Sequence, residues 1–182
     1  MLGAFLGDFL TPKSAAPLGN TVVQEIRLHR RVDSFTDSHL LVKAARRVCS
    51  PPNRLFARIA LDVYYDHFLI KHWDKYSEQS MDQIIDRFYA VIDRSAEHLP
   101  PKVLQVTKRI VAQDWLRSYQ SADGVQRAVV GISRRLSRKR EHLIQAIIEL
   151  RQNAAAVEAG FVEFYPSLQQ HVHSERALAT KA

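Results

Sequence analysis

The chain has 182 residues, 46% of them hydrophobic, which is enough for one sizeable core and short for two domains. Its 26 Lys and Arg outnumber its 19 Asp and Glu, and the net charge of +7 favours an acidic partner: a nucleic acid, an anionic membrane or an acidic protein. The single cysteine, Cys49, excludes an internal disulfide and favours the cytoplasm. No apolar run approaches the roughly 18 residues of a membrane span. Residues 1–10 lack the basic leader of a signal peptide. We therefore expect a soluble protein with neither a membrane span nor a signal peptide.

The spacing of apolar residues predicts an all-α fold, because they recur three and four positions apart and no segment alternates as a strand does. We expect a single helical domain over residues 1–182. In chain order, the predicted helices cover residues 2–10, 18–35, 38–49, 53–72, 81–97, 101–112, 122–136 and 139–167. The residues at 113–120 are predicted to form a turn, and the last ten residues are expected to fray.

Proline pairs and short polar side chains set the predicted helix boundaries. Asp37 or Ser38 is expected to cap the third helix and Asn53 the fourth, because a short oxygen-bearing side chain accepts a hydrogen bond from the free first-turn amides. The proline pairs at 51–52 and 100–101 end the helices before them. The residues predicted to face a core are Val22, Ile26, Val32, Leu55, Ile59, Val63, Phe68, Ile84, Ile85, Phe88, Val91, Ile92, Leu143, Ile147, Leu150, Val157, Phe161 and Phe164.

One stretch, His29–Asp37 with the sequence HRRVDSFTD, carries three potential metal ligands. Successive helical residues turn by about 100°, so His29, Asp33 and Asp37, spaced four apart, drift by only about 40° per step and share one face. A solvated amphipathic helix would show the same spacing of charges. Arg30 and Arg31 lie on the same turn and are suited to phosphate oxygens, which arginine grips with forked, charge-assisted hydrogen bonds.

A second stretch, Asp62–His67 with the sequence DVYYDH, repeats this spacing on a helix that is otherwise largely apolar. The alternative is that these aspartates cap a helix or form ion pairs with Arg58 or Lys71. Two acidic rows with a histidine each are hard to bury unless a positive charge lies between them, so we favour a divalent metal. Ligation by carboxylates favours Mn²⁺ or Mg²⁺ over a zinc site of the thiolate type.

The remaining charged groups suggest a partner more than a reaction. Four arginines near the two rows would make a docking surface for an anionic partner: Arg46, Arg47, Arg54 and Arg58. The basic run at 134–140 lacks interleaved aromatics and any nucleic-acid motif, so we read it as a solvated helix junction and expect no nucleic acid. Cys49 has no base nearby in the sequence, which disfavours a role as nucleophile.

Six separated blocks resemble the acyl carrier protein phosphodiesterase family, which is distantly similar to the HD-type metal-dependent phosphohydrolases. In order they are GAFLGDF at 3–9, IRLHRRVDSFTD at 26–37, LDVYYDHFLIKHW at 61–73, DWLRSY at 114–119, GISRRLSR at 131–138 and FYP at 164–166. The resemblance implies a helical bundle like that of the HD-domain enzymes. Members of the family begin with a short apolar segment containing histidine, and we expect this chain, with Met1 almost at the GxxxxDF block, to lack it.

The resemblance also implies an activity. The reaction is hydrolysis of the phosphodiester that joins 4′-phosphopantetheine to a serine of holo acyl carrier protein, a small acidic protein that suits the charge of +7. Mn²⁺ is the implied metal, with Mg²⁺ or another divalent ion as an alternative. The implied metal ligands are Asp8, His29, Asp33, Asp37, Asp62, Asp66 and His67. We expect Asp33 and Asp66 to serve in catalysis, and Arg30 or Arg31 to stabilise charge on the phosphoryl oxygens.

Two other functions stay open at this point. One is an HD-like phosphohydrolase acting on a nucleotide or another small phosphoester. The other, from a different class, is a non-catalytic basic helical module that binds an acidic protein, with salt-sensitive binding and no dependence on metal.

Overall fold

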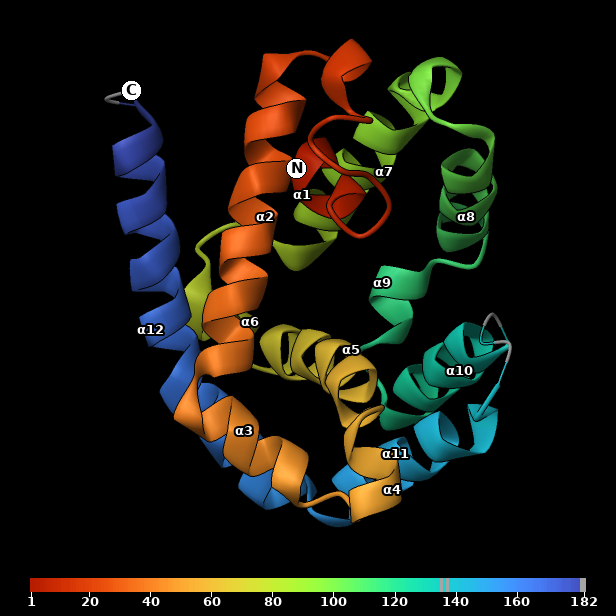
Figure 1. Cartoon of the computed structure of the whole chain (residues 1–182), viewed down its shortest axis with the longest axis vertical. Coiled ribbons are helices and arrows are strands. Elements are labelled where there is room, and N and C mark those ends of the chain that lie inside the picture. Colours follow the sequence, from red (N-terminus) through yellow and green to blue (C-terminus); the bar gives the residue numbers. More distant parts are fainter. Residues whose placement is uncertain (135, 137, 181–182) are drawn as a thin grey trace. The chain divides into compact units, whose positions relative to one another are not determined.

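The computed structural model describes residues 1–134, 136 and 138–180, and its ordered elements are helices throughout, with no strand in that part of the chain (Figure 1). This confirms the predicted all-α class. The helices are α1 (Leu2–Leu6), α2 (Asn20–Ser38), α3 (Leu40–Arg47), α4 (Pro51–Arg54), α5 (Ala57–Lys71), α6 (Trp73–Tyr76), α7 (Met81–Arg94), α8 (Pro101–Ala112), α9 (Trp115–Ser118), α10 (Ala122–Ser133), α11 (Arg140–Gln152) and α12 (Ala154–Thr180). Two single 3₁₀ turns cover Ala16–Leu18 and Ala96–His98.

The chain divides into two compact units, and each is built from several separate segments. Unit 1 comprises residues 1–38, 82–113 and 166–182, and unit 2 comprises residues 39–81 and 114–165. Neither unit is continuous in sequence, because the chain passes from one to the other after residues 38, 81, 113 and 165. The helix α12 contributes to both, with the boundary at Pro166.

Unit 1 is organised by the packing of α1 against α2. The core around these helices contains Leu6, Ile26, Leu99 and Val103, which are all at least 93% buried. The ring of Phe5 meets the edge of Phe88, which joins α1 to α7 with a centroid distance of 5.5 Å. Burying these side chains removes apolar surface from water, which is the main source of stability for a short helix such as α1.

Unit 2 is built around α5, which is buried on most of its circumference. Its residues Ala60, Leu61, Val63, Tyr64 and Phe68 are each no more than 5% exposed. The helices α3, α4, α10 and α11 all contact α5 or its immediate neighbours, and α12 adds aromatic rings to the same core. The polar strip left on α5 is therefore narrow.

A polar cluster ties α4 to α11 in unit 2, and it changes the role predicted for Asn53. Glu149 accepts hydrogen bonds from the Ser50 amide at 2.9 Å, the Ser50 hydroxyl at 2.8 Å and the Asn53 side-chain amide at 3.0 Å. Burial alone would raise the pKa of Glu149, but these hydrogen bonds outweigh it and lower the pKa. Asn53 thus lies buried inside α4 and does not cap the helix that follows.

Several other boundaries differ from the prediction. The first helix ends at Leu6, not at residue 10, and α2 continues through Asp37 to Ser38, so that His39 caps α3 by accepting from the Leu41 amide. The predicted turn at 113–120 contains the single helical turn α9. Leu55 was expected to face a core, but it follows a short helix at a chain bend and is 73% exposed.

The predicted long helix at 139–167 is two helices. It breaks at Asn153, where the side-chain amide donates to the Glu149 carbonyl at 2.8 Å and occupies an acceptor that a continuing helix would use. The second helix, α12, passes through Pro166 and continues to Thr180, because the core contacts of Phe161 and Phe164 hold the turns before the proline. The residues expected to fray are therefore helical as far as Thr180, and residues 181–182 lie outside the described part. Residue 135, at the predicted end of α10, lies outside it as well.

Candidate active site

Two glycines allow α1 to approach α2 closely enough to build a site. Gly3 and Gly7 lie four residues apart and so face the same way. A Cβ on Gly3 would lie 2.6 Å from the Cβ of Glu25, and a Cβ on Gly7 would overlap the imidazole ring of His29. The close approach brings the chain after α1, including Asp8, beside His29. Sequence reasoning missed the role of Gly7, although its spacing from Gly3 in GAFLG was the available signal.

The imidazole of His29 joins two carboxylates. Its Nε2 lies 3.2 Å from Asp33 Oδ2 and 3.4 Å from Asp8 Oδ1. The His29 side chain is 18% exposed, whereas those of Asp33 and Asp8 are 42% and 67% exposed. The structure thus brings together three of the predicted ligands of unit 1 in a half-buried triad open to solvent on its acidic side.

The charge of this triad follows from its geometry. Hydrogen bonds to Asp33 and then to Asp8 raise the pKa of His29 to about 10, and they outweigh burial, which lowers it. His29 is therefore a cation at neutral pH, held between two anions.

The donor set of the triad matches a divalent metal in its chemistry. One imidazole nitrogen and two carboxylates are ligands that Mn²⁺ and similar cations accept. Within the described residues, however, no group of three His, Cys, Asp or Glu side chains could hold an ion as arranged. In the triad the side chains lie against one another, so a cation bound to Nε2 would take the place of the proton that now joins them.

The four other predicted ligands are on α2 and α5. Asp37 is one turn further along α2 in unit 1. Asp62, Asp66 and His67 are on α5 in unit 2, where the two aspartates are exposed and His67 is half-buried. The Nδ1 of His67 lies 2.6 Å from the carbonyl oxygen of Tyr119, which can only accept, so Nδ1 carries a proton. This contact fixes the ring, as a carbonyl commonly does for histidines that bind metal through Nε2.

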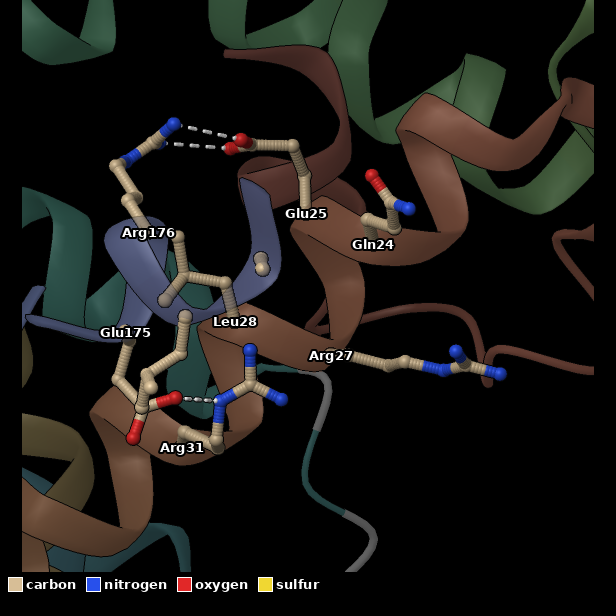
Figure 2. A pocket seen from close by; sticks show the side chains of 9 residues that line it. Gln24, Glu25, Arg27, Leu28, Arg31, Glu175 and Arg176 are labelled. Carbon is tan, nitrogen blue, oxygen red and sulfur yellow. Dashed lines mark hydrogen bonds and ion pairs between the residues drawn. The ribbon is translucent and has the colours of Figure 1, made fainter. Parts of the chain in front are cut away.

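The two arginines beside His29 point in different directions. Arg31 is two residues from His29 and therefore lies about 200° around the helix. It pairs with Glu175 of α12, while Arg176 pairs with Glu25 at 2.9 Å, as Figure 2 shows. These ion pairs border a pocket of about 660 Å³ in unit 1, between α2 and the end of α12. Arg30 is exposed and only about 100° from His29, so it is the better candidate for a phosphate ligand.

Two further residues considered in the sequence are accounted for by the structure, Lys71 by an ion pair and Cys49 by burial. Lys71, the partner considered for the α5 aspartates in the alternative to a metal site, bonds to Glu158 at 2.8 Å. Cys49 is buried, and burial first, with Glu149 nearby, raises the pKa of its thiol to about 11, so it is no nucleophile at neutral pH. Of the basic run at 134–140, residues 135 and 137 lie outside the described part.

A sequence model described as acyl carrier protein phosphodiesterase matches residues 1–168, a span that contains every predicted ligand. The chain belongs to the acyl carrier protein phosphodiesterase family. Proteins of that name include one from Photorhabdus laumondii subsp. laumondii, 31% identical over 176 residues that cover 96% of this chain and 88% of the relative. Another, from Enterobacter sp. strain 638, is 30% identical over 167 residues, or 91% and 86% of the two chains. A third, from Serratia proteamaculans, is 28% identical and covers 97% and 91%.

The family membership confirms the resemblance drawn from the six blocks. No solved structure matches the chain, so its predicted likeness to the HD-type enzymes stays a prediction. None of the helices in the described ranges has the length and apolar character needed to cross a membrane. The pocket in Figure 2 is formed partly by residues after 168, beyond the family match, whereas the triad of Asp8, His29 and Asp33 lies inside it.

Proposed function

We propose that this chain hydrolyses the phosphodiester between 4′-phosphopantetheine and a serine of holo acyl carrier protein. The products are apo acyl carrier protein and 4′-phosphopantetheine. The observation that carries the proposal is the triad in which His29 Nε2 meets Asp8 and Asp33. The triad lies inside the region that the acyl carrier protein phosphodiesterase family model matches.

In this proposal the triad holds a divalent cation, with Mn²⁺ expected. Asp8 reaches the site because Gly7 lets the chain after α1 lie against the His29 ring, and Asp33 reaches it by the one-turn spacing on α2. When bound, a divalent ion would lower the pKa of a water molecule and would place a positive charge next to the phosphoryl oxygens. Asp37, Asp62, Asp66 and His67 remain predicted ligands.

The hydrolysis needs a nucleophile, a stabilised phosphoryl group and a proton for the leaving serine. Oxygen from water forms the new bond to phosphorus, the bond from phosphorus to the serine oxygen breaks, and that oxygen takes a proton from solvent water. Asp33, the carboxylate of the triad on α2, receives the proton of the attacking water, and Asp66 of unit 2 remains a predicted catalytic residue. Arg30 can donate to the non-bridging oxygens, because its exposed guanidinium lies on the flank of α2 next to the triad.

The direct test is release of 4′-phosphopantetheine from holo acyl carrier protein with added Mn²⁺. We expect activity to fall on chelation and to return with the metal. Asp33→Asn should lower the rate by roughly 10²–10³-fold, the range found when one preorganised charge-stabilising group is removed. Asp93→Asn is the matched control, because Asp93 is an exposed aspartate on α7 of the same unit and outside the site.

The second acidic row is tested in the same assay. If Asp66 belongs to the site, Asp66→Asn loses activity while its thermal unfolding stays close to that of the original chain. Full activity of Asp33→Asn and His29→Ala in folded protein would refute the site. Release of phosphate from small phosphoesters, with none from holo carrier protein, would refute the substrate.

A further inference from the structure

The positive charge of the chain is concentrated in two segments. Residues 38–61 contain five Lys and Arg and no acidic residue, and residues 124–140 contain six and none. Of the 26 basic residues, 15 then remain elsewhere, against all 19 acidic ones. The excess that favours an acidic partner is therefore local, and apart from Ser38 both segments belong to unit 2.

Only the first segment combines its charge with exposed apolar side chains. Leu40 is 80% exposed and Leu55 is 73% exposed, the two highest values among the large hydrophobic residues of the described chain. No large hydrophobic residue within the described part of 124–140 is exposed to this degree. An exposed leucine on its own is ordinary, but two beside a basic surface are typical of a protein contact.

The helix α3 presents one face of this surface to solvent. Lys43 and Arg47 lie within about 60° of Leu40 around the helix axis, whereas Val42 and Ala45 point the other way and are buried. The chain then continues from α3 into α4, which contacts α3 (Figure 1). Arg54 is the last residue of α4, and Leu55 follows it. Arg54 is exposed and is anchored by donating to the Cys49 carbonyl at 3.3 Å. We call Leu40, Lys43, Arg47, Arg54 and Leu55 the α3–α4 surface.

We propose that the α3–α4 surface is the docking site for the acidic carrier protein, an inference that rests on the proposed function. The cations attract carboxylates on the partner, and Leu40 and Leu55 pack against apolar side chains between those carboxylates. A nucleic acid fits less well, because the surface offers aliphatic side chains where stacking on bases needs aromatic ones.

The test separates docking from chemistry. Lys43→Glu with Arg47→Glu should raise KM for holo acyl carrier protein about tenfold or more with little change in kcat, because charges at a contact act mainly on association. Binding of apo acyl carrier protein, measured by titration calorimetry, should weaken by the same factor. Leu40→Ala with Leu55→Ala should weaken binding with an unchanged salt dependence, since it removes no charge.

The matched control is Lys102→Glu with Lys108→Glu, which makes the same change of charge on exposed positions of α8 and should leave KM close to that of the original chain. Unchanged KM and binding in the α3–α4 variants, with folding confirmed by circular dichroism, would overturn the docking site and leave the proposed function standing. Binding that depends on the surface, without any release of phosphopantetheine, would support the docking site and overturn the proposed function. The inference would also be overturned if duplex DNA bound as tightly as the carrier protein and if the variant with Lys43→Glu and Arg47→Glu lost this binding.

Discussion

The acidic rows of α2 and α5 have nearly the same sequence pattern but different surroundings. Each places two aspartates one turn apart beside a histidine. On α2, His29 faces both Asp33 of its own helix and Asp8 from the chain after α1. On α5, His67 bonds instead to the backbone carbonyl of Tyr119. The other faces of α5 are in the core. The difference shows that spacing aligns side chains on a helix, whereas a neighbouring segment decides what they meet.

The largest effect is expected at the histidine of the α2 row. His29→Ala removes the atom that both carboxylates share, and we expect release of phosphopantetheine to fall by roughly 10²–10³-fold. His72→Ala is the matched control, because His72 also meets a carboxylate, Glu158 at 2.7 Å. His72 lies at the C-terminal end of α5 and is not a predicted ligand. It should keep most of its activity. Equal losses in the two variants would mean that the α2 triad is not special.

The next effect concerns the glycine that sets the approach of α1 to α2. Gly7 has an ordinary φ of −56°, so alanine there is not strained in its backbone but would overlap the His29 ring. Because a misplacement of about 1 Å can cost about 10²-fold in rate, we expect Gly7→Ala to lower kcat by up to that factor.

Gly160→Ala provides the contrast for Gly7. Gly160 lies inside α12 with nothing within 4 Å of the added Cβ, so alanine should leave activity unchanged and raise the free energy of unfolding by about 0.5–1 kcal/mol. The two variants are compared by steady-state rates and by urea unfolding. Normal kinetics for Gly7→Ala would show that the packing seen around His29 is not needed for activity.

A pH-dependent effect on stability is expected at the end of α5. Burial raises the pKa of Glu158, but hydrogen bonds from Lys71 and His72 outweigh it and hold the pKa below its usual 4.5. A lowered pKa in the folded state gives stability that is present above pH 4.5 and lost as the pH falls below it. Glu158→Gln should therefore reduce the free energy of unfolding at neutral pH by about 1.5–3 kcal/mol, the range for hydrogen bonds to charged groups.

Urea unfolding from about pH 3 to pH 7 measures this difference, which should shrink towards acid pH because the original carboxylate becomes neutral there. Activity serves as the second readout. A difference that stays constant over the whole range would show that the loss is one of packing and not of charge.

The smallest effects separate the two arginines of α2. Arg30→Ala should lower kcat by about tenfold through the loss of one charged hydrogen-bond donor to phosphate. Arg31→Ala breaks the pair with Glu175, in which the arginine is 43% exposed, so it should cost less than about 1 kcal/mol of stability and leave kcat nearly unchanged. The reverse order of effects would transfer the phosphate contact to the side of α2 that borders the pocket in Figure 2.

The sequence by itself determined the helical class, the faces of the long helices and the family. Ile26, Val63, Phe68, Leu143 and Phe161 are buried as their spacing predicted, because helical periodicity is a local property of the chain. The alignment of His29 with Asp33 follows from the same periodicity, and the six blocks identified the family without any structure.

Only the tertiary structure decided what lies opposite those faces. It joined Asp8 to His29, turned Asn53 from a cap into a partner of Glu149, and paired Arg31 with Glu175 and Lys71 with Glu158. It also left Leu40 and Leu55 exposed beside five basic residues. Each of these contacts depends on how two segments pack, and packing of segments far apart in the chain leaves no periodic signal in the sequence.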